Sequence, residues 1–356
     1  MSIKFTSEDW ARIKEDYDKW WNRKIDRPLI KVTLQNEYDY SGTIPLLSQE
    51  SCHRLDISAE DVIERIHIHL EHQEFLGDSF PSYNFDCFGP GLVAAFLGAR
   101  LDNSTGKVWF HPKQVKELRD MHFEFDKNNV WFNRVKDIYG AGMKKWKGNV
   151  LMGMPDLGGI LDVLATLRGS QELLCDFYDN PEEVKRVSRE IQEIWLEYYR
   201  AFEEILMPQS PGYTDWSGEF SITPVYVVQC DLSYMIGPDM FKEFVADDLN
   251  ALCGALSHSL FHMDGKGELV HLPQLMEMES LDAIQWCPGE GVPRTMEWMD
   301  VYRQIRQSGK NMQILGNETD FKAIVKEIGM QGLYFNIPSY PVSARDEMLK
   351  LIDEYK

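Results

Sequence analysis

A histidine and an aspartate with the potential for chemistry stand two residues apart at the end of an apolar run. The stretch FHMDGKGE covers residues 261–268 and places His262 and Asp264 just before two glycines. On a β-strand, side chains at i and i+2 point to the same face. The pair therefore predicts one of three features: two metal ligands, an acid/base pair in which the carboxylate fixes the imidazole tautomer, or a core histidine followed by an ordinary turn.

Polar side chains also end several other apolar runs of strand length. Asp156 follows 149–154, Gln229 and Asp231 lie at the end of 225–230, and Asn336 ends 332–336. If these runs are parallel strands of a barrel, their carboxyl ends meet at one rim, where barrel enzymes place their chemistry. We therefore expect Asp156 and Asp231 as further catalytic carboxylates, and Gln229 and Asn336 as substrate-binding groups. The alternative explanation is that polar residues follow most buried strands simply because loops are exposed to solvent.

The elements that must position these residues alternate between strand and helix. From residue 224 onward, each apolar run is followed by a helical pattern, which is typical of parallel strands with crossover helices. Seven runs are clear, and a weaker one lies at 212–216 or 82–88; together they predict an α/β fold, a single-domain (β/α)8 TIM barrel over 1–356. The seven clear runs are 28–34, 149–154, 225–230, 259–263, 282–286, 311–315 and 332–336. A doubly wound open sheet is the alternative, but no GxGxxG follows the first strand.

The N-terminal segment predicts a helical addition to this barrel. Residues 1–25 carry a helical pattern with no apolar signal core, and we expect this helix to pack on the barrel. Trp20 and Trp21 within it are candidate anchors for a partner chain, so a homo-oligomer is among the expectations.

Composition excludes several classes of partner. The chain has 37 basic and 57 acidic residues and a net charge of −20, without a run of Lys or Arg that could follow a phosphate backbone. Nucleic acid and anionic membrane surfaces are therefore not expected partners. No stretch reaches the roughly 18 apolar residues of a membrane span, and the six cysteines form no CxxC, so we expect a cytoplasmic protein with reduced thiols.

Weaker candidates surround the expected pocket. Arg168 can hold a substrate carboxylate, although an ion pair with a carboxylate such as Asp162 is the more ordinary role. Trp216 and Tyr226, near expected strand ends, can stack on a substrate ring or belong to the core. The loop CPGEGVP at 287–293 either shapes the pocket or only connects two elements.

Several longer motifs resemble one superfamily. They are DRPLI near the start, FGPGLVAAFLG at 88–98, MPDLGGILDVLATLRG at 154–169, QCDLSYMIGPDMFKEFV at 229–245 and FHMDGKGELVHLPQL at 261–275. Together they look like the uroporphyrinogen decarboxylase-like superfamily, which is similar to corrinoid-linked methyltransferases and to the catalytic half of cobalamin-independent methionine synthase. The resemblance covers nearly the whole chain and implies a (β/α)8 barrel with a pocket at the carboxyl ends of the strands.

The resemblance also narrows the chemistry. True uroporphyrinogen decarboxylases carry an arginine-rich N-terminal motif, of which only Asp26, Arg27 and Pro28 remain, so binding of a polyanionic porphyrinogen is not expected. The methyltransferase branch binds zinc through a His-x-Cys and a later Cys. Here His262 matches the histidine, and Asp264 stands where that cysteine would be. With Cys287 they imply a zinc site of mixed N, O and S ligands, and a metal-free site is the alternative.

Three functions follow as expectations. The first is an enzyme that transfers a methyl group from a small molecule to a corrinoid protein or thiol acceptor. The second is a metal-free decarboxylase or acid/base lyase that uses His262 and Asp264. The third is a catalytically silent barrel that binds a small molecule.

Overall fold

The centre of the protein is a mainly parallel β-sheet. The computed structural model describes residues 3–289, 291–292 and 296–356. Its main sheet has the order β12-β1-β11-β10-β9-β8-β7, and β2 pairs antiparallel with β1. The bounds are β1 Leu29–Gln35, β2 Gln73–Gly77, β7 Val225–Gln229, β8 His258–Asp264, β9 Ala283–Cys287, β10 Asn311–Leu315, β11 Leu333–Asn336 and β12 Tyr340–Pro341. All pairings other than that of β2 are parallel in this sheet, as the alternating sequence pattern predicts.

The remaining strands are short. β3 (Ser82–Tyr83) pairs in parallel with β6 (Leu151–Met152), and β4 (Arg100–Asp102) pairs antiparallel with β5 (Trp109–His111). Both weak runs contribute: 82–88 supplies β3, and 212–216 takes part in two isolated bridges, Asp215 with Met154 and Tyr213 with Ser221. Among the described residues these pieces do not join the main sheet into a closed ladder. The fold is therefore mixed α/β with a barrel-like parallel sheet, and the expected closed eight-stranded barrel is found only in part.

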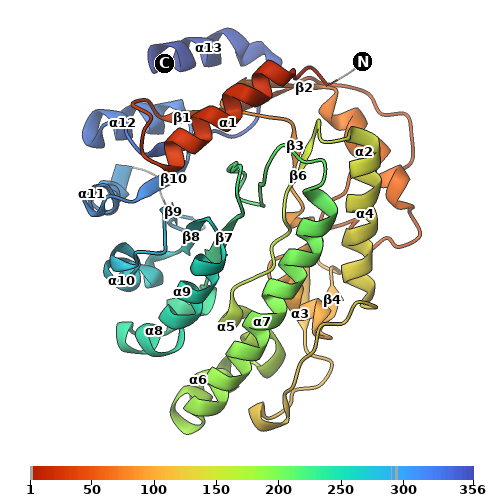
Figure 1. Ribbon diagram of the computed structural model, residues 1–356, viewed down its shortest axis with the longest axis vertical. Helices are drawn as coiled ribbons and strands as arrows, with labels where there is room; N and C mark the ends of the chain where they lie inside the picture. The colour runs from red at the N-terminus through yellow and green to blue at the C-terminus, as the bar shows by residue number, and fades with distance from the viewer. Residues whose placement is uncertain (1–2, 290, 293–295) are drawn as a thin grey trace.

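Helices cover both sides of the strands. In Figure 1, α10 to α12 lie along one side of β8 to β10, and α2, α4 and α7 lie across the molecule from them. The bounds are α1 Ser7–Trp21, α2 Ala59–Leu70, α3 Leu92–Phe96, α4 Val130–Trp146, α5 Ile160–Arg168, α6 Ser170–Asp179, α7 Pro181–Leu206, α8 Pro238–Phe244, α9 Ala246–Ala255, α10 Leu272–Glu277, α11 Met299–Ser308, α12 Glu318–Ile328 and α13 Arg345–Glu354. No helix in the described ranges combines the length and apolar character that a membrane crossing requires.

The N-terminal helix α1 lies against the amino ends of the strands. It begins with a capping box, in which Thr6 and Asp9 exchange side-chain to backbone hydrogen bonds. Its last residues reach the sheet: the backbone carbonyl of Trp20 accepts a hydrogen bond from Asn311, the first residue of β10. Trp20 and Trp21 are 0% and 4% exposed, so they are core residues of this chain and not the partner anchors that we expected.

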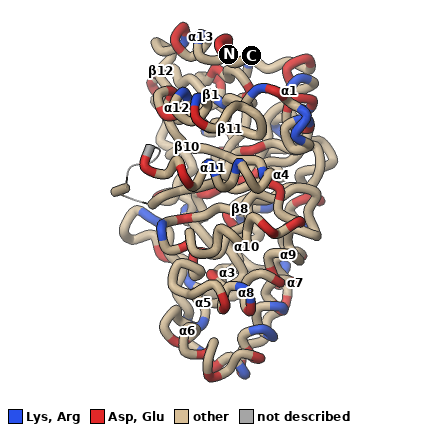
Figure 2. Tube along the Cα trace, turned by 90° about the vertical axis from the view of Figure 1, so that its left-hand side faces the viewer, with Lys and Arg blue, Asp and Glu red and all other residues tan. Residues whose placement is uncertain are grey.

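Charges of both signs are interspersed on one face of the molecule. On the face drawn in Figure 2, Lys and Arg are interspersed with Asp and Glu from α13 down to α6. The net charge of −20 is therefore not concentrated in one patch of this face.

Candidate active site at the carboxyl ends of the strands

Strand register brings the predicted residues of β7, β8 and β9 together. Gln229 pairs with His262, His262 pairs with Gln285, and Asp264 pairs with Cys287. Residues that are paired in a parallel sheet share a face, and side chains alternate between faces along each strand. Gln229, His262 and Gln285 thus form one layer on the inner face, and Asp264 and Cys287 lie in the next layer toward the rim.

A pocket of about 380 Å³ opens at this rim. The residues that line it are His262, Asp264, Trp286, Cys287, Pro288, Gly289 and Leu315. They come from the carboxyl ends of β8, β9 and β10 and from the start of the CPGEGVP loop, of which positions 290 and 293 lie outside the described residues. The three residues of the expected metal site thus share one pocket wall.

The imidazole of His262 has a glutamine as its partner. Nδ1 of His262 is hydrogen-bonded to Oε1 of Gln285, in place of the Asp264 carboxylate that the spacing predicted. Sγ of Cys287 lies 3.9 Å from the same Nδ1 and 3.6 Å from the same Oε1. The Trp216 ring meets the imidazole edge to face, with ring centroids 5.0 Å apart. His262 is therefore held by an amide and an indole, beside a thiol.

Asp156 is a buried carboxyl group on the loop after β6. It is 7% exposed, and its Oδ1 accepts hydrogen bonds from the backbone N–H groups of Gly158 and Gly91, at 2.9 and 3.4 Å. Burial and the nearby Asp231 raise its pKa to about 8, more than these N–H groups lower it. At neutral pH Asp156 is thus mostly protonated.

Asp162 and Asp231 are two further carboxyl groups near Asp156. Asp162, near the start of α5, accepts hydrogen bonds from the backbone N–H groups of Asp231 and Leu232, at 3.0 and 2.8 Å. Burial and the charge of Asp231 raise the pKa of Asp162 to about 7. Asp231 is itself exposed to solvent, and its pKa is raised by desolvation and by Asp264, against the opposing effect of His262.

Glu268 completes this group and was not among the predicted site residues. It is 1% exposed, and its Oε2 accepts the backbone N–H of Asp264 at 3.0 Å. Burial and the charge of Asp231 raise its pKa to about 9, so at neutral pH it is a carboxylic acid that can donate a proton. Glu268 stands in the same FHMDGKGE stretch as His262, but its sequence position alone does not indicate burial.

The donor set does not fit the expected zinc site. A structural or catalytic zinc ion needs at least three protein ligands that converge on one point. His262 and Cys287 lie close enough to share an ion, yet the residues that the structure describes contain no group of three His, Cys, Asp or Glu side chains that could hold one.

Two predicted substrate-binding residues are engaged elsewhere. Arg168 ends α5 and binds the carboxylates of Asp176 and Glu117, at 2.7 and 3.0 Å; its ion pair is therefore not with Asp162 and not in the pocket. Tyr226 is 1% exposed. Its hydroxyl donates to the backbone carbonyl of Pro155 at 2.9 Å and accepts the backbone N–H of Leu157 at 2.7 Å. It orders the loop that carries Asp156 and does not face the pocket.

The other three lie in or next to the inner layer. Trp216 contacts His262, as described above. Nδ2 of Asn336 donates to the backbone carbonyl of Ser217 at 3.2 Å, so it supports the segment that carries Trp216. Gln229 is 6% exposed, and its Oε1 has no hydrogen-bond partner among the described residues.

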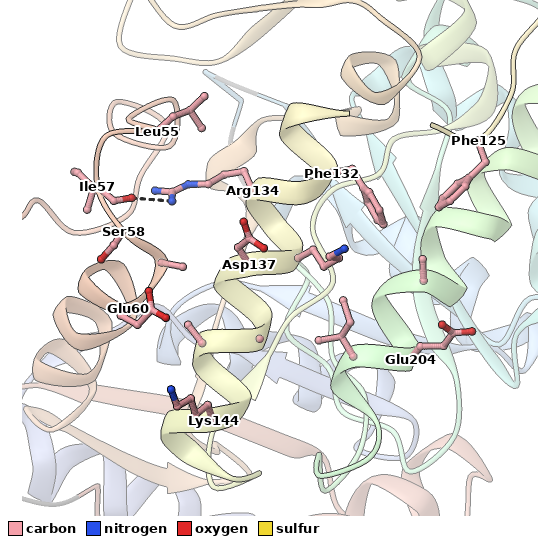
Figure 3. A pocket seen from close by; sticks show the side chains of 16 residues that line it. Leu55, Ile57, Ser58, Glu60, Phe125, Phe132, Arg134, Asp137, Lys144 and Glu204 are labelled. Atoms are coloured by element: carbon pink, nitrogen blue, oxygen red, sulfur yellow. Dashed lines mark hydrogen bonds between the residues drawn. The ribbon is translucent and has the colours of Figure 1, made fainter. Parts of the chain in front are cut away.

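A larger cavity lies on the helical side of the molecule. It has about 1030 Å³ and runs between α2, α4 and α7, far from the strand ends. Figure 3 shows Arg134 on α4, turned toward the carbonyl of Ile57, to which it donates at 2.8 Å. Glu60, Asp137, Lys144 and Glu204 are all exposed to solvent. This cavity lacks the converging buried groups that catalysis needs.

Comparison with known proteins supports the architecture. The sequence matches no protein-family model and no curated protein. Among solved structures, the chain is similar to a methyltransferase from Methanosarcina mazei, with a TM-score of 0.60 and 12% sequence identity over 99% of both chains. At this identity the likeness establishes a methyltransferase-like fold over the full length of the chain.

Proposed function

We propose that this chain is an enzyme that transfers a methyl group from a small molecule to a thiol or corrinoid acceptor, at the rim of a (β/α)8-type barrel. The observation that carries the proposal is the pocket of about 380 Å³ at the ends of β8, β9 and β10, with a histidine, a cysteine and a carboxylate in its wall. The full-length likeness to a methyltransferase fold supports the same reaction class. A corrinoid protein is the proposed partner where the acceptor is a corrinoid.

Methyl transfer from a neutral donor involves the transfer of a proton. When a methyl group leaves a neutral donor, the leaving group departs with negative charge and takes up a proton. His262 lies in the pocket wall, where it can transfer this proton. The protonated carboxyl groups of Asp156 and Glu268 both lie near Asp231, which also interacts electrostatically with His262. Trp286 and Leu315 provide the apolar surface that a small donor requires.

The namesake reaction of the superfamily has no support. Arg27, the arginine that remains of the carboxylate-binding motif, makes two hydrogen bonds of 2.8 Å to Asp78 and one of 2.9 Å to Asp16. Its guanidinium is thus already neutralised by carboxylates of its own chain, and a porphyrinogen carboxylate would have to displace them.

The direct test is a search for methylated product. Purified protein is incubated with methyl ethers, methylamines and methyl thioethers, and with either cob(I)alamin or a small thiol as acceptor. Methylcobalamin is followed by absorbance and the methyl thioether by mass spectrometry. We expect product with wild type, little with His262→Ala, and an unchanged rate with His122→Ala, which alters an exposed histidine. Absence of methylated acceptor from every donor would contradict the proposal.

A metal-free decarboxylase or acid/base lyase is the second candidate. It is favoured by the two protonated carboxyl groups near Asp231, because a carbanion left by loss of CO2 needs an acid to protonate it. Release of CO2 from a panel of carboxylic acids, without methyl transfer, would favour this candidate. Ligand-induced thermal stabilisation without any turnover would instead favour the silent binding protein.

A further inference from the structure

A chain of side-chain amides crosses the inner layer of the sheet and ends at His262. Nε2 of Gln313 donates to the backbone carbonyl of Ser217 at 2.9 Å. Oε1 of Gln313 accepts from Nε2 of Gln285, and Oε1 of Gln285 faces Nδ1 of His262. The three side chains come from β10, β9 and β8 at paired positions of the sheet. Gln285 and Gln313 are 2% and 0% exposed, so water does not compete for these bonds.

The direction of the chain is fixed at its far end. A backbone carbonyl only accepts hydrogen bonds, so the group of Gln313 that faces Ser217 must be the amide nitrogen. The oxygen of Gln313 then faces Gln285, which must donate with its own nitrogen. The oxygen of Gln285 is left for His262, and Nδ1 must carry a hydrogen to bond it. Reversal would set the oxygen of Gln313 against the carbonyl of Ser217, in a buried site where such a mismatch is costly.

We propose that this amide chain holds neutral His262 as the Nδ1–H tautomer and leaves the lone pair on Nε2, with Gln285 and Gln313 as positioning residues. The thiol of Cys287 points to the same conclusion, because its Sγ lies 3.6 Å from Oε1 of Gln285 and an S–H group is a donor. One acceptor oxygen thus serves two donors. Gln313 contacts neither His262 nor the pocket wall and acts only through Gln285.

The Nδ1–H tautomer assigns a proton-transfer step to His262 in the proposed methyl transfer, and this step rests on the proposed function. With a thiol acceptor, Nε2 takes the S–H proton, and the thiolate sulfur forms the new S–CH3 bond as the bond from the methyl group to the donor breaks. The proton on Nε2 then neutralises the departing group, so atoms and charge balance and the imidazole returns to its starting state. The tautomer itself is a property of the resting protein, whichever reaction the site catalyses.

The test reads the ring nitrogens directly. The full chain is labelled with ¹⁵N-histidine, treated with a chelator and studied by two-dimensional NMR at a pH where the ring is neutral. The signals of His262 are assigned by their loss in His262→Gln. We expect Nδ1 to show the chemical shift of a protonated nitrogen and Nε2 that of an unprotonated one. The Nε2–H tautomer in wild type would overturn the proposal, even if methyl transfer were found.

Variants separate positioning from a structural role. Gln313→Met and Gln285→Met keep the side-chain length and remove the amide, so we expect a mixture of tautomers in each, with a lower turnover rate. Gln304→Met, on an exposed face of α11, is the matched control and should leave the spectrum unchanged. If both Met variants kept the wild-type spectrum, and circular dichroism showed that they were folded, the positioning role of the Gln285 and Gln313 amides would be contradicted.

Discussion

Two histidines on strand β8 show how differently its two ends are used. His258 begins the strand and stacks on Trp21 of α1, with ring centroids 4.7 Å apart and an interplanar angle of 9°. His262 lies four residues later, in the wall of the rim pocket, and is held by Gln285 beside the thiol of Cys287. The same residue type on the same strand is a packing element at the amino end and a candidate catalytic group at the carboxyl end.

The surroundings of the two ends differ in the same way. At the amino end, α1 and aromatic side chains such as Trp20 and Phe220 close the sheet, and the buried carboxylate of Asp78 is paired with Arg27. At the carboxyl end, the buried carboxyl groups of Asp156 and Glu268 have no arginine or lysine partner among the described residues, and burial raises their pKa values. Unpaired acids cost stability, which is the usual signature of a site kept for function.

The largest expected effect is a loss of stability at the amino end of the strands, where Asp78 is paired with Arg27. Arg27→Met removes the two guanidinium hydrogen bonds of 2.8 Å to Asp78 and leaves this carboxylate the longer ion pair to Arg12, at 3.7 Å. Asp78 is almost fully buried and accepts the backbone N–H of Ile30 at 2.7 Å. We expect the free energy of unfolding to fall by about 3 kcal/mol in urea titrations. Arg54→Met, which breaks an exposed pair with Asp56, is the matched control and should have a much smaller effect. Equal losses in the two variants would remove the distinction between the ends.

The two histidines provide the second test. His262→Gln should lower the rate constant kcat by about 100-fold, because it removes a proton-transfer group, and should leave the unfolding midpoint nearly unchanged. His258→Gln should do the reverse: a loss of about 1 kcal/mol from the broken stack on Trp21, with kcat retained. Steady-state kinetics and urea titrations of both variants decide this. A fall in kcat for His258→Gln equal to that for His262→Gln would break the comparison.

The third prediction concerns pH and the unpaired acids. The pKa of Glu268 is raised from 4.5 to about 9 in the folded protein, so the stability linked to its proton is present below pH 4.5 and is lost as the pH rises toward 9. One such group contributes a slope of at most about 1.4 kcal/mol per pH unit. Glu268→Gln should therefore flatten the decline of the unfolding free energy between pH 5 and 9.

The control for this prediction is a glutamate on the surface. Glu204→Gln alters an exposed side chain of α7 and should keep the wild-type pH dependence. If Glu268→Gln followed the wild-type curve as closely as Glu204→Gln, then Glu268 would be ionised in the folded protein at neutral pH. The pair of neutral acids proposed near Asp231 would then lose one of its two members.

The smallest effect is expected at Trp216. Its ring edge contacts His262, and aromatic contacts of this kind contribute about 1 kcal/mol. Trp216→Leu should thus lower kcat/KM by roughly five-fold, since about 1.4 kcal/mol corresponds to ten-fold. Trp109→Leu, at an exposed position of β5, is the matched control. An equal decrease in both variants would show that the indole of Trp216 does not act through His262.

The sequence by itself determined the parallel strand and helix alternation. Apolar runs of strand length reflect only which residues must be buried. They predicted a strand at 311–315, which is β10, and one at 259–263, which is one residue shorter than β8 at each end. They also placed His262, Asp264 and Cys287 at strand ends, and the structure brings these three residues to one pocket.

The tertiary structure decided the partners and the protonation states. No local pattern says that His262 bonds Gln285, because the two residues are 23 positions apart and meet only through strand register. Likewise, Glu268 and Asp156 become neutral acids because other elements exclude water from them, and Arg168 turns to Asp176 because α6 follows α5 closely. Sequence period fixes which face a residue takes, whereas desolvation and hydrogen-bond partners depend on the neighbours that the complete fold supplies.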